Sequence, residues 1–237
     1  MSITNIIREN GYYSSNNIIS DEDLSQLRNF IDLKLKEFPN KNFRLYEDSF
    51  KNTVIDDKKF EDKINKIISE VLRDNNINDY KKPNYKVLRV VSGVQQKKQA
   101  YLYHFDAHLI TILIPIIIPN NKSGKNGDLV IFPNLRKVHK NLILNIIQKI
   151  FFQNFISRTL LNTKLLRKIF NYKLLKIKPG NVYMFFGFRS LHANLEIETF
   201  STRATLLIHC YDVFENSSIV KMNRKQSINK EIKNIKV

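Results

Sequence analysis

Hydrophobic and polar residues change their spacing along this chain near residue 85. Before that point, apolar residues recur every three or four positions in two stretches, which predicts two helices. The first helix begins after Ser20, which forms a capping pair with Asp23, and it stops at Pro39. The second runs from about Asp57 to Arg73, and its apolar face comprises Phe60, Ile64, Ile67, Ile68 and Val71.

From Tyr85 onward, short runs rich in β-branched and aromatic residues alternate with turn signals such as Ser92-Gly93 and Pro179-Gly180. The runs that read as strands are YKVLRVVS, AYLYHFD, HLITILIPII, GDLVIFP, LLKIKPGNVYMFFG and RATLLIHCYDVF. Helices followed by many strands predict a mainly β fold with flanking helices. Short strands favour a sandwich or jelly roll, because two paired sheets protect their edges.

Residues 135–172 interrupt the strand pattern and predict two helices inserted between strands, with a broad apolar face that includes Val138, Leu142, Ile146, Ile147, Ile150 and Phe151. The surrounding stretch 134–178 holds 11 Lys/Arg and no Asp/Glu, and residues 217–237 hold six Lys/Arg and one acid. Three interpretations of the insert stay open. It forms a structural layer outside the sheet, a wall of a substrate pocket, or a peripheral contact with an anionic membrane surface.

The 237 residues suffice for one domain with a sizeable core, which we expect over residues 1–216, followed by a basic tail at 217–237. The single cysteine, Cys210, excludes an internal disulfide framework and suits a reducing compartment. The N-terminus shows no secretory signal, and the longest apolar run, Leu109 to Pro119, is too short to span a bilayer. We therefore expect a cytoplasmic protein.

The candidate chemistry lies in the triplet His104-Phe105-Asp106 and in His192. Two imidazoles and one carboxylate form a facial set that suits Fe(II) and leaves three coordination positions open. Residues two apart on a straight strand share a face, so His104 and Asp106 are expected to point the same way. A jelly roll places distant strands side by side, which allows His192 to reach the same metal.

Arg203 opens the apolar strand RATLLIHCYD, eleven residues after His192. A buried arginine at this point needs an anion, and a carboxylate satisfies its planar fork best. His108, four residues after His104, is a candidate substrate contact, and Arg89 on VLRVVS is a candidate partner for an anionic substrate. His209, within LLIHCYD, is interpreted as a buried, hydrogen-bonded strand residue.

The HFD triplet, His192 and Arg203 resemble the signature of the phytanoyl-CoA hydroxylase-like branch of the Fe(II)/2-oxoglutarate dioxygenases. The segment NGYYSSNNIISDEDLSQLRNFID is similar too, and the resemblance spans about residues 8–213. It implies a double-stranded β-helix, a cupin-like jelly roll, in which His104, Asp106 and His192 ligate Fe(II). Arg203 would then pair with the far carboxylate of 2-oxoglutarate, and Asn194 falls at a position for a polar co-substrate contact. No catalytic residue beyond the metal ligands is implied.

The activity that this resemblance implies consumes O2 and 2-oxoglutarate, hydroxylates a small-molecule or lipid-like substrate, and releases succinate and CO2. The presence of Asp106 favours hydroxylation or desaturation over halogenation, because related halogenases lack this carboxylate. The loop NNKSGKNGDLVIFP and the basic helices depart from the family pattern, so the resemblance does not extend to a substrate.

Two other functions stay open. One is a cupin-type metal enzyme that does not use 2-oxoglutarate, and the other is a non-catalytic module that binds membranes or another polyanion through the basic segments. The sequence lacks the interleaved aromatic pattern of single-strand binders, so no nucleic-acid partner is expected.

Overall fold

The computed structural model describes residues 1–39, 41–78, 80, 84–92, 100–218, 220–222 and 226. Its helices are α1 (Ile3–Asn10), α2 (Asp21–Glu37), α3 (Lys58–Asp74), α4 (Leu142–Gln153), α5 (Phe155–Leu161) and α6 (Lys164–Ile169), with short 3₁₀ turns at Glu47–Phe50 and Val54–Asp56. Its strands are β1 (Tyr13–Ser15), β2 (Phe43–Tyr46), β3 (Tyr85–Val91), β4 (His108–Ile117), β5 (Leu129–Phe132), β6 (Lys173–Leu175), β7 (Val182–Phe185), β8 (Leu191–Asn194) and β9 (Arg203–Asp212).

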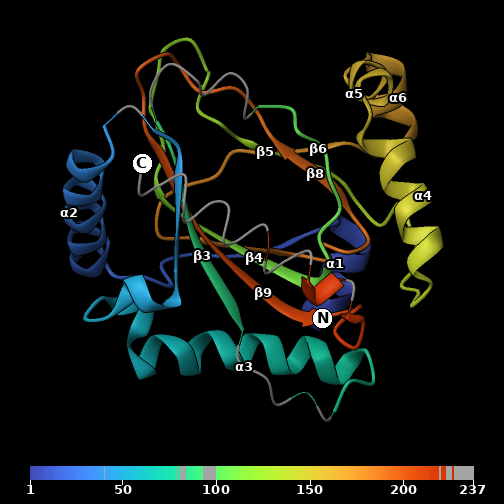
Figure 1. Cartoon of the computed structure of the whole chain (residues 1–237), viewed down its shortest axis with the longest axis horizontal. Coiled ribbons are helices and arrows are strands. Elements are labelled where there is room, and N and C mark those ends of the chain that lie inside the picture. Colours follow the sequence, from blue (N-terminus) through green and yellow to red (C-terminus); the bar gives the residue numbers. More distant parts are fainter. Residues whose placement is uncertain are drawn as a thin grey trace.

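These strands form two antiparallel sheets (Figure 1). The larger sheet has the order β1-β7-β4-β9-β3-β2, and the smaller sheet has the order β6-β5-β8. Neighbours such as β4 and β9 lie far apart in the sequence, as expected when a chain winds back and forth between two sheets. The prediction of a mainly β fold with flanking helices is confirmed, and the antiparallel arrangement is consistent with a jelly roll.

The larger sheet separates a helix-covered layer from the interior of the sandwich. On β9, Leu206 and Ile208 belong to the core cluster that contains buried residues of α1, α2 and α3. Leu207 between them packs instead with Leu113 and Phe185, in the cluster shared with the smaller sheet. This alternation follows the two-residue period of a strand. One face of the sheet therefore carries the helices, and the other faces the space in which the candidate site lies.

The N-terminal helices match their predicted positions. The Ser20 hydroxyl accepts a hydrogen bond from Asp23 N at 3.1 Å and donates one to Asp23 Oδ2 at 2.7 Å, which satisfies the first turn of α2. Helix α3 begins after Asp57, whose side chain accepts from the backbone of Lys59 and Phe60. Both predicted helices are thus confirmed, with their starts defined by side-chain caps.

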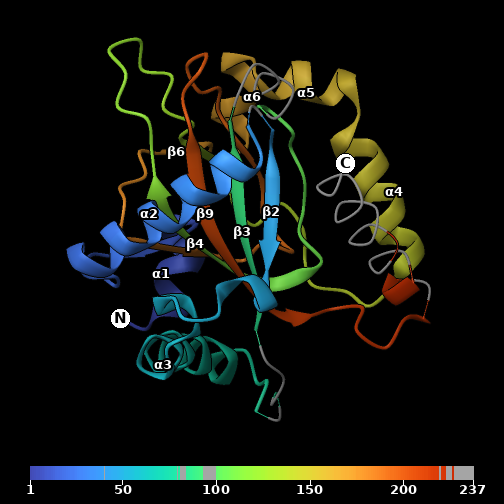
Figure 2. The ribbon, with the colours of Figure 1, turned by 60° about the vertical axis from the view of Figure 1, so that its left-hand side comes forward.

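The insert contains three short helices rather than the two predicted ones, between β5 and β6 (Figure 2). Asn154 follows α4 directly and caps α5, because its side chain accepts from Ser157 N. Thr163 caps α6 by accepting from Leu166 N. Each cap takes an extended backbone, so the helical path breaks at both residues.

Three short elements, α1, β1 and β2, were not predicted as regular structure by hydrophobic spacing, because each is too short to display a clear repeat. Most of the predicted basic tail from residue 217 lies outside the described residues. Within the described part of the chain, none of the helices combines the length and the apolar character that crossing a bilayer requires.

Candidate metal centre

His104 and Asp106 lie on an irregular segment, although the sequence predicts a strand over AYLYHFD. That prediction was wrong, because Tyr101 takes a left-handed φ of 56° and Tyr103 N bonds back to Tyr101 O at 3.0 Å. The segment returns to strand-like pairing at one residue only. His104 and His192 form an isolated β-bridge, in which each backbone N–H donates to the other's carbonyl at 3.0 Å.

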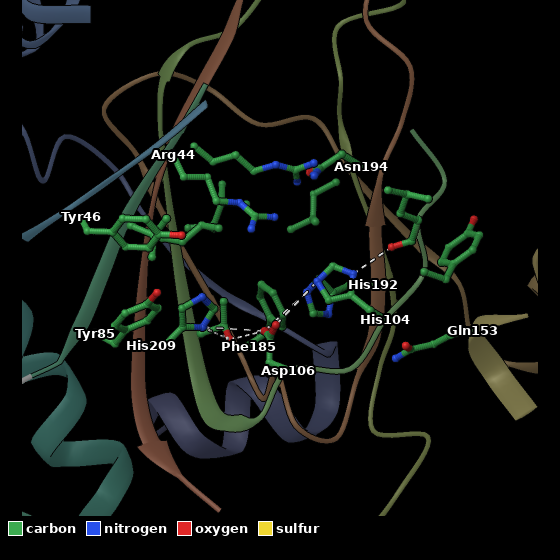
Figure 3. Close-up of a pocket in the computed structure, with 18 of the residues that line it drawn as sticks. Arg44, Tyr46, Tyr85, His104, Asp106, Gln153, Phe185, His192, Asn194 and His209 are labelled. Carbon is green, nitrogen blue, oxygen red and sulfur yellow. Dashed lines mark hydrogen bonds and ion pairs between the residues drawn. The ribbon is translucent and has the colours of Figure 1, made fainter. Parts of the chain in front are cut away.

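This bridge brings the three predicted ligand side chains together. His104 Nε2 lies 3.7 Å from Asp106 Oδ1, and His192 Nε2 lies 3.5 Å from Asp106 Oδ2. One ligand atom from each of the three residues lies within 4.8 Å of the others. Figure 3 shows Asp106 pointing toward both imidazoles at one end of the cavity, with Arg44 and Asn194 at the opposite end. The arrangement can hold a metal ion.

Backbone carbonyls orient both imidazoles. His104 Nδ1 lies 2.8 Å from Leu102 O, and His192 Nδ1 lies 3.1 Å from Ser190 O. A carbonyl oxygen only accepts, so each Nδ1 must carry the hydrogen. In the neutral form of each ring, Nε2 then carries the lone pair on the side of Asp106, which is the tautomer that a metal ligand needs.

The electrostatic environment keeps His104 neutral. Its pKa is lowered to about 4, first because a charged ring would lose hydration within the cavity and second because His192 stands beside it. The pKa of Asp106 moves well below its usual range. Burial alone would raise that pKa, but three neighbouring histidines and the Thr111 hydroxyl outweigh the burial. Neutral imidazoles beside a carboxylate are the protonation states in which these groups bind metals.

Thr111 and His209 hold the carboxylate from the far side. Thr111 Oγ1 donates to Asp106 Oδ2 at 2.5 Å, and it lies 3.2 Å from His209 Nδ1. Because the hydroxyl gives its hydrogen to Asp106, the hydrogen between Thr111 and His209 comes from Nδ1 of the imidazole. His209 Nδ1 also lies 3.9 Å from Asp106 Oδ2. Two residues of neighbouring strands thus fix the orientation of one predicted ligand.

Gly187 leaves the room that Asp106 needs. A Cβ at this position would collide with Thr111 Oγ1 and with Asp106 Oδ2. We expect Gly187→Ala to displace the carboxylate and to weaken metal binding by about tenfold or more, because outer contacts of metal ligands contribute on that scale. Metal titration followed by calorimetry measures the change.

The control for Gly187→Ala is Gly124→Ala, at a turn where no atom stands within 4 Å of the added Cβ. Its φ of +74° makes alanine strained, so this variant loses some stability but should keep the metal affinity of the parent. Equal affinities in both variants would show that Gly187 does not position Asp106.

Arg203 is buried, with 2% of its surface exposed, and its pKa is lowered to about 9 by burial and by the nearby charge of Arg89. Its Nη2 donates to Asn194 Oδ1 at 2.8 Å and its Nη1 to Thr205 Oγ1 at 3.4 Å, while its Nε has no hydrogen-bond partner. Gly127 has a positive φ of 74°, and a Cβ there would lie 2.6 Å from Arg203 Cδ. The guanidinium is therefore packed in place, and the nearby carboxylate of Asp128 partly offsets its charge.

A cavity of about 390 Å³ lies between the two sheets, and the three clustered side chains lie at one end of it (Figure 3). Alternate residues of neighbouring strands line the larger-sheet wall: Arg44 and Tyr46 from β2, Tyr85, Val87 and Arg89 from β3, and Leu207 and His209 from β9. The opposite wall includes Leu129, His192 and Asn194. Arg203 borders a smaller void of about 10 Å³ that shares Arg89 and Asn194 with this cavity.

Of the two predicted substrate-side residues, Arg89 and His108, only Arg89 is among the described residues that line the cavity. The ring of His108 stacks behind the wall, with its centroid 5.1 Å from that of His209 and 6.0 Å from that of Tyr85. His108 thus supports lining residues instead of facing the interior.

Several lining residues escaped the sequence analysis. His209 was assigned only a place in a buried strand, yet it faces the cavity. Counting by twos from Arg203 reaches His209 and would have shown the shared face. Gln153 and Arg158 come from the helical insert, so part of the insert is a wall of the cavity. No hydrophobic pattern marks those two side chains.

The fold is shared with solved structures of oxygenases. A prolyl-4-hydroxylase from Pseudomonas putida matches with a TM-score of 0.57 and 8% identity, over 87% of this chain and 95% of that one. A Trichoplax adhaerens prolyl hydroxylase, solved with a peptide of the hypoxia-inducible factor degradation domain, matches with a TM-score of 0.54 and 13% identity, over 91% of each chain. The non-heme α-ketoglutarate-dependent epimerase SnoN from nogalamycin biosynthesis matches at 0.51 and 9% identity, over 87% of this chain and 79% of that one.

At these identities the likeness establishes the fold, which is the one used by prolyl hydroxylases and by non-heme α-ketoglutarate-dependent enzymes. No family model matches the sequence, and no curated protein matches it either. The narrower resemblance to the phytanoyl-CoA hydroxylase-like branch stays a prediction.

Proposed function

We propose that this protein is an Fe(II)- and 2-oxoglutarate-dependent oxygenase that hydroxylates a small-molecule substrate. The observation that carries the proposal is the convergence of His104, Asp106 and His192, with one ligand atom of each within 4.8 Å of the others. They come from two segments that lie far apart in the sequence, and they lie on the wall of a cavity large enough for small molecules. A fold shared with oxygenases supports the same conclusion.

The donor set fits Fe(II). Two neutral imidazoles and one carboxylate are the ligands of non-heme iron oxygenases, and they leave positions open for a co-substrate and O2. The Nδ1 bonds to Leu102 O and Ser190 O hold both imidazoles in the orientation that directs Nε2 toward Asp106. Gly187 leaves space for the Asp106 carboxylate beside the two imidazoles, because a side chain at this position would push the carboxylate away.

Fe(II) with 2-oxoglutarate and O2 supplies the oxidising power for attack on an unactivated C–H bond, and succinate and CO2 are released. The chain's own residues bind and orient. His104, Asp106 and His192 would hold the metal, and Thr111 keeps Asp106 in one orientation. We propose that Arg203 and Asn194, joined by a 2.8 Å hydrogen bond, hold the far carboxylate of 2-oxoglutarate.

Cavity charge indicates the chemistry of the substrate. Three arginines, Arg44, Arg89 and Arg158, line the cavity, whereas Asp106 is the single acid among its described lining residues. Guanidinium groups favour carboxylate and phosphate groups. We therefore propose a small substrate with at least one anionic group. We also propose a relationship to the phytanoyl-CoA hydroxylase-like branch, without assuming an acyl-CoA substrate.

A second candidate is a metal enzyme that does not use 2-oxoglutarate. Arg203 borders the small void and not the main cavity, and its two Nη groups are engaged by Asn194 and Thr205. That placement is the one observation that favours this candidate. The two functions share the metal ligands and differ in their need for Arg203.

Anaerobic addition of Fe(II) and then 2-oxoglutarate tests the proposal. We expect a weak visible metal-to-ligand charge-transfer band that appears only when both are present. Iron content, measured on the same sample, shows that the metal site is filled. Iron-loaded protein that gives no band with saturating 2-oxoglutarate would contradict the proposed co-substrate and favour the second candidate.

A further inference from the structure

Helix α4 turns Asn145 and Gln148 toward the protein, together with Leu142 and Phe152, and turns most of its other apolar side chains to the outside. Asn145, in the second turn, is buried with 5% of its surface exposed, whereas Ile143 and Ile147 are 70% and 57% exposed. Ile150 and Phe151 continue the exposed side at the same helical spacing. A helix on a soluble core ordinarily has the opposite arrangement.

A buried arginine holds α4 in this orientation. The Arg136 guanidinium lies between the rings of Phe105 and Phe188, 4.1 Å and 3.8 Å from their centroids. Its Nη1 donates to Asn145 Oδ1 at 2.9 Å and to Gln148 Oε1 at 3.1 Å. Turning the apolar side of α4 inward would remove the two side-chain acceptors and leave this buried charge with only the Phe188 carbonyl, which is strongly unfavourable.

Exposed apolar side chains continue on α5 and α6. Eight large apolar side chains, which we call the outer apolar face, are between 57% and 82% exposed: Ile143, Ile147, Ile150, Phe151, Phe155, Ile156, Leu165 and Ile169. Figures 1 and 2 show that α4, α5 and α6 follow one another along the same flank of the molecule, away from α2 and α3. So many exposed apolar side chains on consecutive helices mark a contact surface.

Exposed lysines lie beside part of this face. Residues 134–178, which include all three helices, contain 11 Lys/Arg and no Asp/Glu. Lys164 and Lys168 on α6 are exposed beside Leu165 and Ile169. The partner must therefore combine an apolar interior with negative charge at its surface.

We propose that the outer apolar face docks on the surface of a membrane that contains anionic lipids. Such a surface satisfies both features, because acyl chains take up apolar side chains while anionic headgroups attract lysine and arginine. A second copy of this face would bring two positively charged surfaces together. The segment 217–237 is a poor alternative occupant, since it holds six Lys/Arg and one acid.

Membrane docking would place the cavity close to the lipid. Gln153 at the end of α4 and Arg158 on α5 line the cavity and belong to the same helices as the outer apolar face. The docking itself needs neither Fe(II) nor 2-oxoglutarate. Its failure therefore leaves the proposed oxygenase activity untouched, and failure of that activity leaves the docking untouched.

Vesicle flotation with the full chain tests the proposal. We expect the protein to float with phosphatidylcholine vesicles that contain about 30% phosphatidylglycerol, and to bind pure phosphatidylcholine vesicles at least about tenfold more weakly, at about 0.1 M salt. The double variant Phe151→Ser/Phe155→Ser should lower the partition coefficient on anionic vesicles by about tenfold or more. Lys164→Gln/Lys168→Gln should lower it by several-fold, on the order of fivefold.

Matched controls lie on other surfaces. Leu33 on α2 and Phe200 are also exposed apolar residues, and Lys36 and Lys51 are exposed lysines outside the insert. Leu33→Ser/Phe200→Ser and Lys36→Gln/Lys51→Gln should bind vesicles as the parent does. The proposal is overturned if folded parent protein stays unbound, if the controls lose as much binding as the test variants, or if anionic and neutral vesicles bind it equally. It is also overturned if sedimentation shows a dimer that Phe151→Ser/Phe155→Ser dissociates, because this face would then join two copies.

Discussion

Replacing His192 by alanine is expected to abolish 2-oxoglutarate-dependent succinate formation and to raise the dissociation constant for Fe(II) by about 100-fold or more, beyond what loss of an outer contact costs. His192 supplies one of three clustered ligand atoms, and its Nε2 stands 3.5 Å from Asp106. Its backbone bonds to His104 do not depend on the side chain, so the bridge is retained. Anaerobic metal titration and mass-spectrometric quantification of succinate measure the two effects.

His139→Ala is the matched control, because it removes an imidazole from the insert and none from the metal cluster. It should bind Fe(II) and form succinate as the parent does. The far-ultraviolet circular dichroism spectrum shows whether His192→Ala is folded. If the folded variant bound iron as tightly as the parent, the assignment of the metal ligands would be wrong.

Replacing Arg203 by glutamine is expected to raise the KM for 2-oxoglutarate by about thirtyfold or more, because removing one partner of a buried charge pair costs about 2–5 kcal/mol. Fe(II) binding should stay unchanged, since Arg203 is not among the clustered ligands. Glutamine keeps much of the side-chain volume and limits the loss of packing against Gly127. Steady-state succinate formation over a range of 2-oxoglutarate concentrations gives the KM.

Arg73→Gln, in the last turn of α3 and exposed, is the control for charge alone and should leave the KM unchanged. Arg89→Gln distinguishes Arg89 from Arg203, because Arg89 lines both the main cavity and the small void, whereas Arg203 borders only the small void. A thirtyfold effect in Arg89→Gln but not in Arg203→Gln would assign the carboxylate to Arg89. Substrate turnover that needs no added 2-oxoglutarate, in the parent and in both variants, would favour the second candidate function.

The clustering of His104, Asp106 and His192 could be anticipated because their residue types carry the information. An H-x-D triplet beside an apolar strand and a distant histidine after another strand define a ligand set without knowledge of exact coordinates. The geometry that joins them could not be anticipated. A turn at Tyr101 replaces the expected strand, and a single bridge replaces the expected ladder.

Helix α4 shows why the sequence alone left the orientation of the insert open. Its apolar spacing is that of a helix that buries Ile147 and Ile150, and hydrophobicity alone assigns that side to the interior. The buried Arg136 reverses the choice, because its hydrogen bonds require Asn145 and Gln148 to face inward. Hydrophobic periodicity assigns polar residues such as Asn145 and Gln148 to the surface, so it does not predict this buried contact. His209 is the opposite case, since two-residue counting along β9 would have found it.

The reciprocal bonds between His104 and His192 tie the spacing of the ligands to the alignment of two backbones. Residues next to each other on a strand project to opposite sides, so a slip of one position would send an imidazole away from Asp106. Correct pairing of segments almost ninety residues apart is therefore a precondition for coordination. Binding of iron by this chain would thus indicate that the two sheets have paired in their native alignment.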